Sequence, residues 1–127
     1  MKELIITNNR DVNIAFANSV NVEFHEESDQ MEILLIARDY IHLGAKLIMH
    51  PMLGRIKPHE TPYKSVFLEN VRGALDVQSL VIIEDSIAET YKFLDQKINK
   101  KYGEAMLKDL RYIDYLLLQN GVDEYKR

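Results

Sequence analysis

The first 49 residues alternate between short apolar segments and amphipathic ones, and this order limits the folds open to the chain. Strand-like runs at residues 2–7, 21–25 and 46–49 are separated by helix-like segments at residues 11–18 and 30–43. A strand, a helix and a second strand in succession form a right-handed crossover between parallel strands. Two consecutive crossovers predict an α/β domain with helices on both faces of a small, mainly parallel sheet.

Capping residues set the expected helix boundaries. Asp11 is predicted to cap the first helix. Asp29 followed by Glu32 is typical of a capping box, and Gly44 suits a left-handed position just after the second helix. Further along, residues 65–69 predict a fourth strand, and Asp76 is expected to cap a helix that runs to residue 97.

A last helix is predicted over residues 104–119, ended by Asn120 and Gly121, with residues 123–127 frayed. The simplest strand order is 2-1-3, with the fourth strand beside the third or antiparallel at an edge. Residues 1–127 are therefore expected to form a single three-layer α/β domain with a C-terminal helix pair.

Composition excludes several classes of function. The chain has no cysteine, so it supplies no thiol nucleophile, disulfide or iron–sulfur ligand. Its apolar runs are too short for a membrane span, and no secretory signal precedes the first strand, which predicts a cytoplasmic protein. The net charge of −4 argues against nucleic-acid binding. No glycine-rich dinucleotide or P-loop motif and no nucleophile elbow is present, so we expect no cofactor.

The segment between residues 45 and 65 concentrates the positive charge. It carries four basic side chains against one acidic one, a net +3 in a chain that is −7 elsewhere, and it holds all three prolines. A long loop without secondary structure is often functional, and prolines stiffen it. It follows a strand whose carboxyl end is expected to lie beside that of the first strand. The loop is either an anion-accepting site or a solvated buttress of the sheet edge.

The anion-binding interpretation names nine ligand-binding candidates. Lys57 and Lys64 are expected to recognise charge, His50 and Tyr63 to shape the pocket, and Gly54 to allow a close backbone approach. Neighbouring polar side chains from the loop and the first strand complete the set: Asn8, Asn9, Thr61 and Ser65.

Other interpretations of these residues stay open. His50 is the one catalytic candidate, as an acid or base acting on a small carboxylate or phosphorylated metabolite held by Lys57. The two asparagines could equally cap the first helix. His50, His59 and Glu60 match no metal-binding motif, so no metal is predicted.

Two features of the C-terminal half also have alternatives. Asp114 falls on the inward face of the last helix, where it is expected to pair with a basic residue or border an interface, with catalysis the minor alternative. The apolar stripe from Leu80 to Leu94 is interpreted as core or as the seam of a homodimer.

The run His-Pro-Met-Leu-Gly-Arg-Ile-Lys-Pro-His-Glu-Thr-Pro-Tyr-Lys-Ser-Val at residues 50–66, with Thr-Asn-Asn at 7–9, resembles the GrdX family. The resemblance covers nearly the whole chain and departs from the usual pattern at Met52 and Arg55. Members are small proteins encoded beside glycine, sarcosine and betaine reductase genes in amino-acid-fermenting anaerobes. The resemblance implies an accessory role near such a reductase, with an acidic segment of a reductase subunit as an alternative to a small anion.

Overall fold

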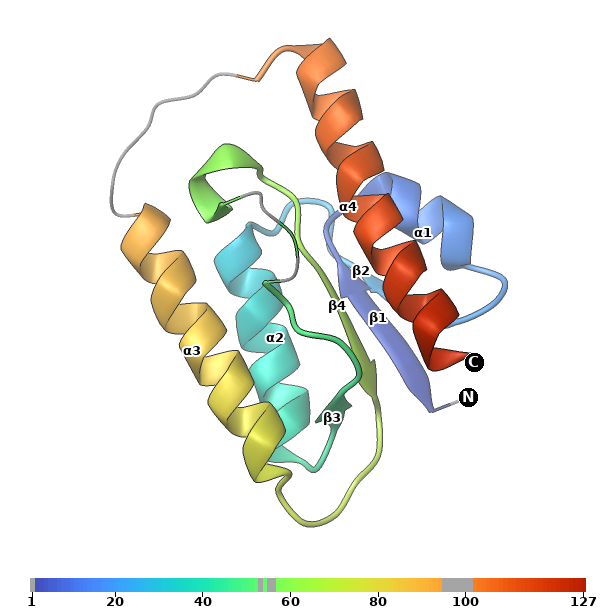
Figure 1. The fold of residues 1–127 in the computed structure, drawn as a ribbon, viewed down its shortest axis with the longest axis vertical. Helices are drawn as coiled ribbons and strands as arrows, with labels where there is room; N and C mark the ends of the chain where they lie inside the picture. The colour runs from blue at the N-terminus through green and yellow to red at the C-terminus, as the bar shows by residue number, and fades with distance from the viewer. Residues whose placement is uncertain (1, 53, 55–56, 95–101) are drawn as a thin grey trace.

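The computed structural model describes residues 2–52, 54, 57–94 and 102–127 (Figure 1). In chain order the elements are β1 (Glu3–Thr7), α1 (Arg10–Phe16), β2 (Asn21–Phe24), α2 (Gln30–His42), β3 (Lys46–Leu47), the 3-10 turn η1 (Pro58–Glu60), β4 (Ser65–Glu69), α3 (Val77–Leu94) and α4 (Glu104–Tyr125). The predicted α/β class is confirmed. The predicted end of the third helix at residue 97 lies outside the described residues, and so does Arg55, one of the two departures from the usual pattern.

The four strands form a mixed sheet in the order β2-β1-β4-β3. β1 is parallel to β2, but β4 pairs antiparallel with both β1 and β3. The prediction of a mainly parallel sheet with the third strand beside the first is therefore wrong. β4 occupies the central position because its three middle residues, Val66, Phe67 and Leu68, are buried on both faces of the sheet. The third strand forms only two pairs with β4, and it is shorter than the four residues predicted.

Alternating side chains of β1 and β4 supply two cores. Leu4, Ile6 and Leu68 face α2 and α3 on one side, where Ile33 and Ile83 pack against them. Ile5 and Phe67 face α1 and α4 on the other side, where Leu118 and Val122 complete the packing. Figure 1 shows the two helix pairs on opposite faces of the sheet.

Local signals fixed most helix ends as expected. The Asp29–Glu32 capping box opens α2, and Gly44 follows it with a φ of 114°. The Asp76 carboxylate accepts the Ser79 amide at the start of α3. The cap of α1, however, is Asn9 rather than Asp11, because the Asn9 side chain accepts the Asp11 amide.

Helix α4 continues to Tyr125, so the predicted end at residue 119 and the predicted fraying beyond residue 122 are both wrong. Val122 is buried in the core shared with α1, and that packing offsets the helix penalty of Gly121, about 1 kcal/mol. Gly121 lies against the Met49 side chain, whose end would have to shift to admit a Cβ atom. The glycine that suggested a helix end is instead a point of close contact.

On α3, part of the predicted apolar stripe packs on the core, through Leu80, Ile83 and Ile87. Tyr91 and Leu94 at its end are exposed. None of the helices described is both long enough and apolar enough to cross a membrane.

Candidate functional site

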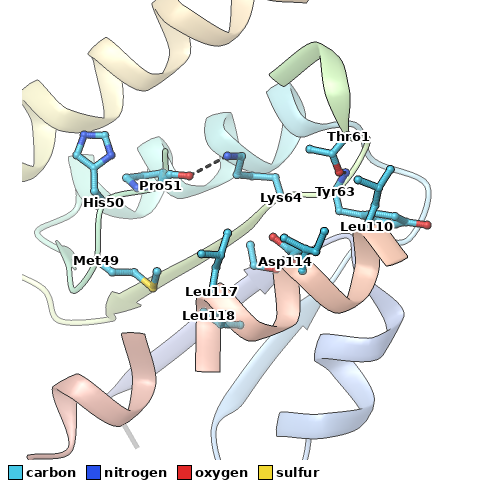
Figure 2. A pocket seen from close by; sticks show the side chains of 12 residues that line it. Met49, His50, Pro51, Thr61, Tyr63, Lys64, Leu110, Asp114, Leu117 and Leu118 are labelled. Atoms are coloured by element: carbon cyan, nitrogen blue, oxygen red, sulfur yellow. Dashed lines mark hydrogen bonds between the residues drawn. The ribbon is translucent and has the colours of Figure 1, made fainter. Parts of the chain in front are cut away.

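A small cavity lies at the edge of the sheet where β1 ends and β4 begins (Figure 2). Its volume is about 50 Å³. The loop after β3, the start of β4 and the inner face of α4 line it, through Met49, His50, Pro51, Thr61, Tyr63, Lys64, Ser65, Leu110, Ile113, Asp114, Leu117 and Leu118. Loop and strand contribute the polar side chains, while α4 contributes apolar ones and a single carboxylate.

Asn8 joins three segments of chain at this edge. Its Nδ2 donates to the carbonyls of Ser28 and Pro62, each at 2.9 Å. Its Oδ1 accepts the backbone amide of Lys64, also at 2.9 Å. Every polar atom of the Asn8 side chain is thereby committed to backbone groups, which fixes the end of the loop against β1.

Asn9 is fully buried and ties the opposite side of the site to α4. Its Oδ1 caps α1, and its Nδ2 donates to the Arg111 carbonyl at 2.9 Å and to Asp114 Oδ2 at 3.0 Å. Asn9 therefore caps α1, as one of the two alternatives for the asparagine pair predicts, and it also has a tertiary role that local sequence does not signal.

Asp114 ends a chain of hydrogen bonds that crosses the sheet edge. The Asn9 amide donates to Thr7 Oγ1, the Thr7 and Ser65 hydroxyls are 2.7 Å apart, and the Ser65 hydroxyl donates to Asp114 Oδ2 at 2.7 Å. Because the Ser65 hydroxyl gives its one hydrogen to Asp114, the Thr7 hydroxyl donates to Ser65. Burial raises the pKa of Asp114, while these hydrogen bonds and the nearby Lys64 charge oppose the rise.

Lys64 brings the opposite charge to the cavity. Its Nζ donates to the Pro51 carbonyl at 2.8 Å and lies 3.6 Å from Met52 Sδ. Burial lowers the pKa of Lys64, and the Asp114 charge partly restores it. The ion pairs found among the described residues do not include a direct pair between Lys64 and Asp114.

Tyr63 is held in place from α4. Arg111 donates to the Tyr63 hydroxyl at 2.9 Å, and its guanidinium lies 5.8 Å from the centre of the tyrosine ring. The Arg111 Nε also lies 3.5 Å from the Asp11 carboxylate. Loop, α1 and α4 are therefore linked to one another around the cavity.

The structure brings five of the nine predicted ligand-binding residues to the cavity wall: His50, Thr61, Tyr63, Lys64 and Ser65. Asn8 and Asn9 lie behind the wall and organise it. The first strand and the loop do meet, but not through neighbouring ends of the first and third strands as predicted: β4 lies between those strands, and Asn8 pairs with the segment that enters β4.

The other two candidates lie elsewhere. Lys57 is exposed, with Nζ 5.6 Å from the ring centre of Phe93 on α3. Gly54 has a φ of 103°, and a Cβ there would come within 2.9 Å of Leu117, so the residue contributes a close approach to α4. His50 is exposed, its Nδ1 accepts the Met52 amide, and Figure 2 shows its ring directed away from Lys64 and Asp114.

Asp114 is the functional candidate that the sequence analysis undervalued. The sequence predicts its position on the inward face of α4, but within the described part of the chain its hydrogen bonds go to Asn9 and Ser65 and not to a basic residue. A lone carboxylate at helical spacing from Leu110 and Leu117 was the available signal.

A second, larger cavity of about 660 Å³ lies on the other side of residues 61–63. Three acidic side chains border it, Glu26, Glu27 and Asp29, together with the aromatic rings of Phe93 and Tyr102. Negative charge on its wall makes this cavity unsuited to an anion. Within the described residues, no group of three or more histidine or acidic side chains is arranged to hold a metal ion.

Fold and site together define a small α/β protein with a mixed sheet and a charged cavity at one sheet edge. The chain belongs to the GrdX-like protein family, whose model matches residues 4–123. No curated protein and no solved structure matches the chain. The match confirms the family indicated by residues 50–66.

Proposed function

We propose that this protein binds a small carboxylate or a similar anion in the cavity between the loop after β3 and helix α4. One observation carries the proposal. The ammonium group of Lys64 is partly withdrawn from water at the cavity wall, with a carbonyl and a thioether as its neighbours and, among the residues that the structure describes, no directly paired carboxylate. A buried charge of this kind is costly unless it is paired, and an anion would supply the partner.

The size of the cavity favours a small molecule over a protein segment. One water-sized group needs about 10–15 Å³ of such space, so the cavity accepts about three to five non-hydrogen atoms. The other candidate partner, an acidic segment of a reductase subunit, would have to bind at the surface around the loop.

The surroundings of the cavity are already organised. Asn8, Asn9 and Arg111 fix the loop, α1 and α4 through hydrogen bonds that need no ligand. Little further ordering is then required on binding, which lowers its free-energy cost.

Membership in the GrdX-like family suggests an association with glycine-reductase-related systems. In that setting the proposed role is that of an accessory protein that holds a small metabolite. The alternative, an enzyme with His50 as acid or base, finds less support, because the ring points away from the two charged side chains. Turnover that is lost in His50→Ala would favour the enzyme.

The test is calorimetric titration of the full chain with acetate and with inorganic phosphate. Lys64→Met keeps the length of the side chain but removes its charge. A charge-assisted contact contributes about 1.5–3 kcal/mol, so we expect affinity to fall about 10- to 150-fold. Lys57→Ala, in the same loop but outside the cavity, is the matched control and should bind as the wild type does. Equal affinity of Lys64→Met and the wild type would refute the assignment of the site.

A further inference from the structure

The cavity presents two opposite charges, and this narrows the chemistry of its ligand. We infer that the site takes a small zwitterion, with its carboxylate on Lys64 and its ammonium group on Asp114. This inference rests on the proposed function, since it assumes that an anionic group binds Lys64. It adds a role for Asp114 and a class of ligand, the amino acids with a short carbon chain.

The first support is the arrangement of the two charged groups. Lys64 enters from the start of β4 and Asp114 from α4, and both line the same cavity (Figure 2). They are not joined by a direct ion pair among the described contacts. A molecule with a negative end and a positive end can neutralise both groups at once, whereas a simple carboxylate would add a second negative charge near Asp114.

The second support is the unused hydrogen-bonding capacity of Asp114. Asn9 and Ser65 both donate to Oδ2, and no described residue donates to Oδ1. A carboxylate has room for about four donors, so half of its capacity is free. An ammonium group carries three N–H donors and suits that free oxygen.

The third support is that the volume of the cavity and its apolar lining both suit a short amino acid. Space for about three to five non-hydrogen atoms admits an amine and a carboxylate separated by one carbon atom, and little more. Leu110, Ile113 and Leu117 line the cavity with apolar surface that suits the intervening carbon. An amino acid with a large side chain would not fit without movement of α4.

The experiment compares three ligands that differ in one charged group each. Glycine is the zwitterion, acetate lacks the amine and methylamine lacks the carboxylate. Each is titrated into the full-length wild type at pH 7 by calorimetry. We expect glycine to bind at least about tenfold more tightly than acetate, because it gains a charge-assisted contact, and methylamine to bind more weakly than glycine.

The variant Asp114→Asn tests whether the ammonium group of the ligand contacts Asp114. Asparagine keeps an oxygen that accepts from Asn9 and Ser65, so the hydrogen bonds behind the cavity are retained. This variant should bind acetate at least as tightly as the wild type does. It should no longer bind glycine more tightly than acetate. Asp109→Asn, which removes an exposed carboxylate from the same helix, is the control and should keep that advantage.

The outcomes separate the two proposals. Equal affinity of the wild type for glycine and acetate would overturn the zwitterion while leaving the anion site intact. Binding of neither glycine nor acetate would overturn the zwitterion, and a further failure to bind inorganic phosphate would overturn the anion site as well. If Asp114→Asn still prefers glycine to acetate as strongly as the wild type does, Asp114 does not contact the ligand. Because the wild-type comparison stands alone, the inference stays testable even where the variant folds poorly.

Discussion

Asn9 offers the sharpest test of how the sheet edge is stabilised, because its side chain has two roles that can be tested separately. Its oxygen caps α1, and its nitrogen bridges β1 to α4 through Arg111 and Asp114. In Asn9→Ala, loss of the cap should cost about 1 kcal/mol. Loss of the bond to the Asp114 carboxylate should cost a further 1.5–3 kcal/mol, roughly, since that group stays partly buried. Because neighbouring effects are not additive, we expect a total of about 3 kcal/mol.

Asn9→Asp separates the two roles. Aspartate caps helices about as well as asparagine, so a purely local role predicts almost no change. The structure predicts the opposite, because a second carboxylate would stand about 3.0 Å from Asp114 Oδ2 and would have no N–H to donate. Two carboxylates at that distance compete for one proton. Asn9→Asp should therefore be at least as destabilised as Asn9→Ala at pH 7 and should regain more stability at about pH 5.

The assay is equilibrium urea unfolding of the wild type and both variants at the two pH values. Asn18→Ala, an exposed asparagine just after α1, is the control and should fall within about 0.5 kcal/mol of the wild type. If Asn9→Asp at pH 7 also unfolds within about 0.5 kcal/mol of the wild type, the bridge from β1 to α4 does not stabilise the protein and the reasoning fails.

Three further predictions concern stability. Burial raises the pKa of Asp114 above its ordinary 3.8, so the folded state holds this proton more tightly and stability should fall as pH rises through the folded value. Asp114→Asn should lose less stability over that interval in urea unfolding, and parallel pH curves would contradict this. Gly44→Ala should cost at least about 2 kcal/mol, because φ is 114° and the added Cβ would lie 2.5 Å from the Gly73 nitrogen; an unchanged midpoint of thermal unfolding would be inconsistent with that contact. Asp29→Ala should cost about 1 kcal/mol by urea unfolding through loss of the capping box, and a neutral result would show that the box does not stabilise α2.

Local chemistry made much of the fold predictable. Asp29, Gly44 and Asp76 act through neighbours a few residues away, and each marks a helix end that the structure confirms. Strand pairing depends on distant residues instead. The run Val66–Leu68, uninterrupted and apolar, was a signal for a central strand covered on both faces, whereas the third strand begins with the exposed Lys46. Weighing these two runs against each other would have favoured β4 as the partner of β1.

The site was predictable to the extent that it lies in one segment. Charge and prolines single out residues 45–65, and seven residues of this segment line the cavity. The other wall comes from α4, about 50 residues later in the chain: Ser65 and Asp114 are 49 positions apart. Nothing in the spacing of α4 residues reveals which loop they will face, so Asp114 could be placed inward but its partners could not be named. For the same reason the sequence does not reveal that Lys57 and Lys64, two lysines of one loop, have different surroundings.

The bridge between Asn9 and Asp114 joins residues 105 positions apart, and this has a consequence for the protein as it is being made. At about 5–20 residues per second, the ribosome needs roughly 5–20 s to advance from the first of these residues to the second. During that time β1, the loop and β4 can emerge and meet, while Lys64 stands without the wall that α4 provides. A nascent chain therefore acquires its cavity only when α4 has left the ribosome. The ligand that we propose for this site would then stabilise finished molecules and would not assist their early folding.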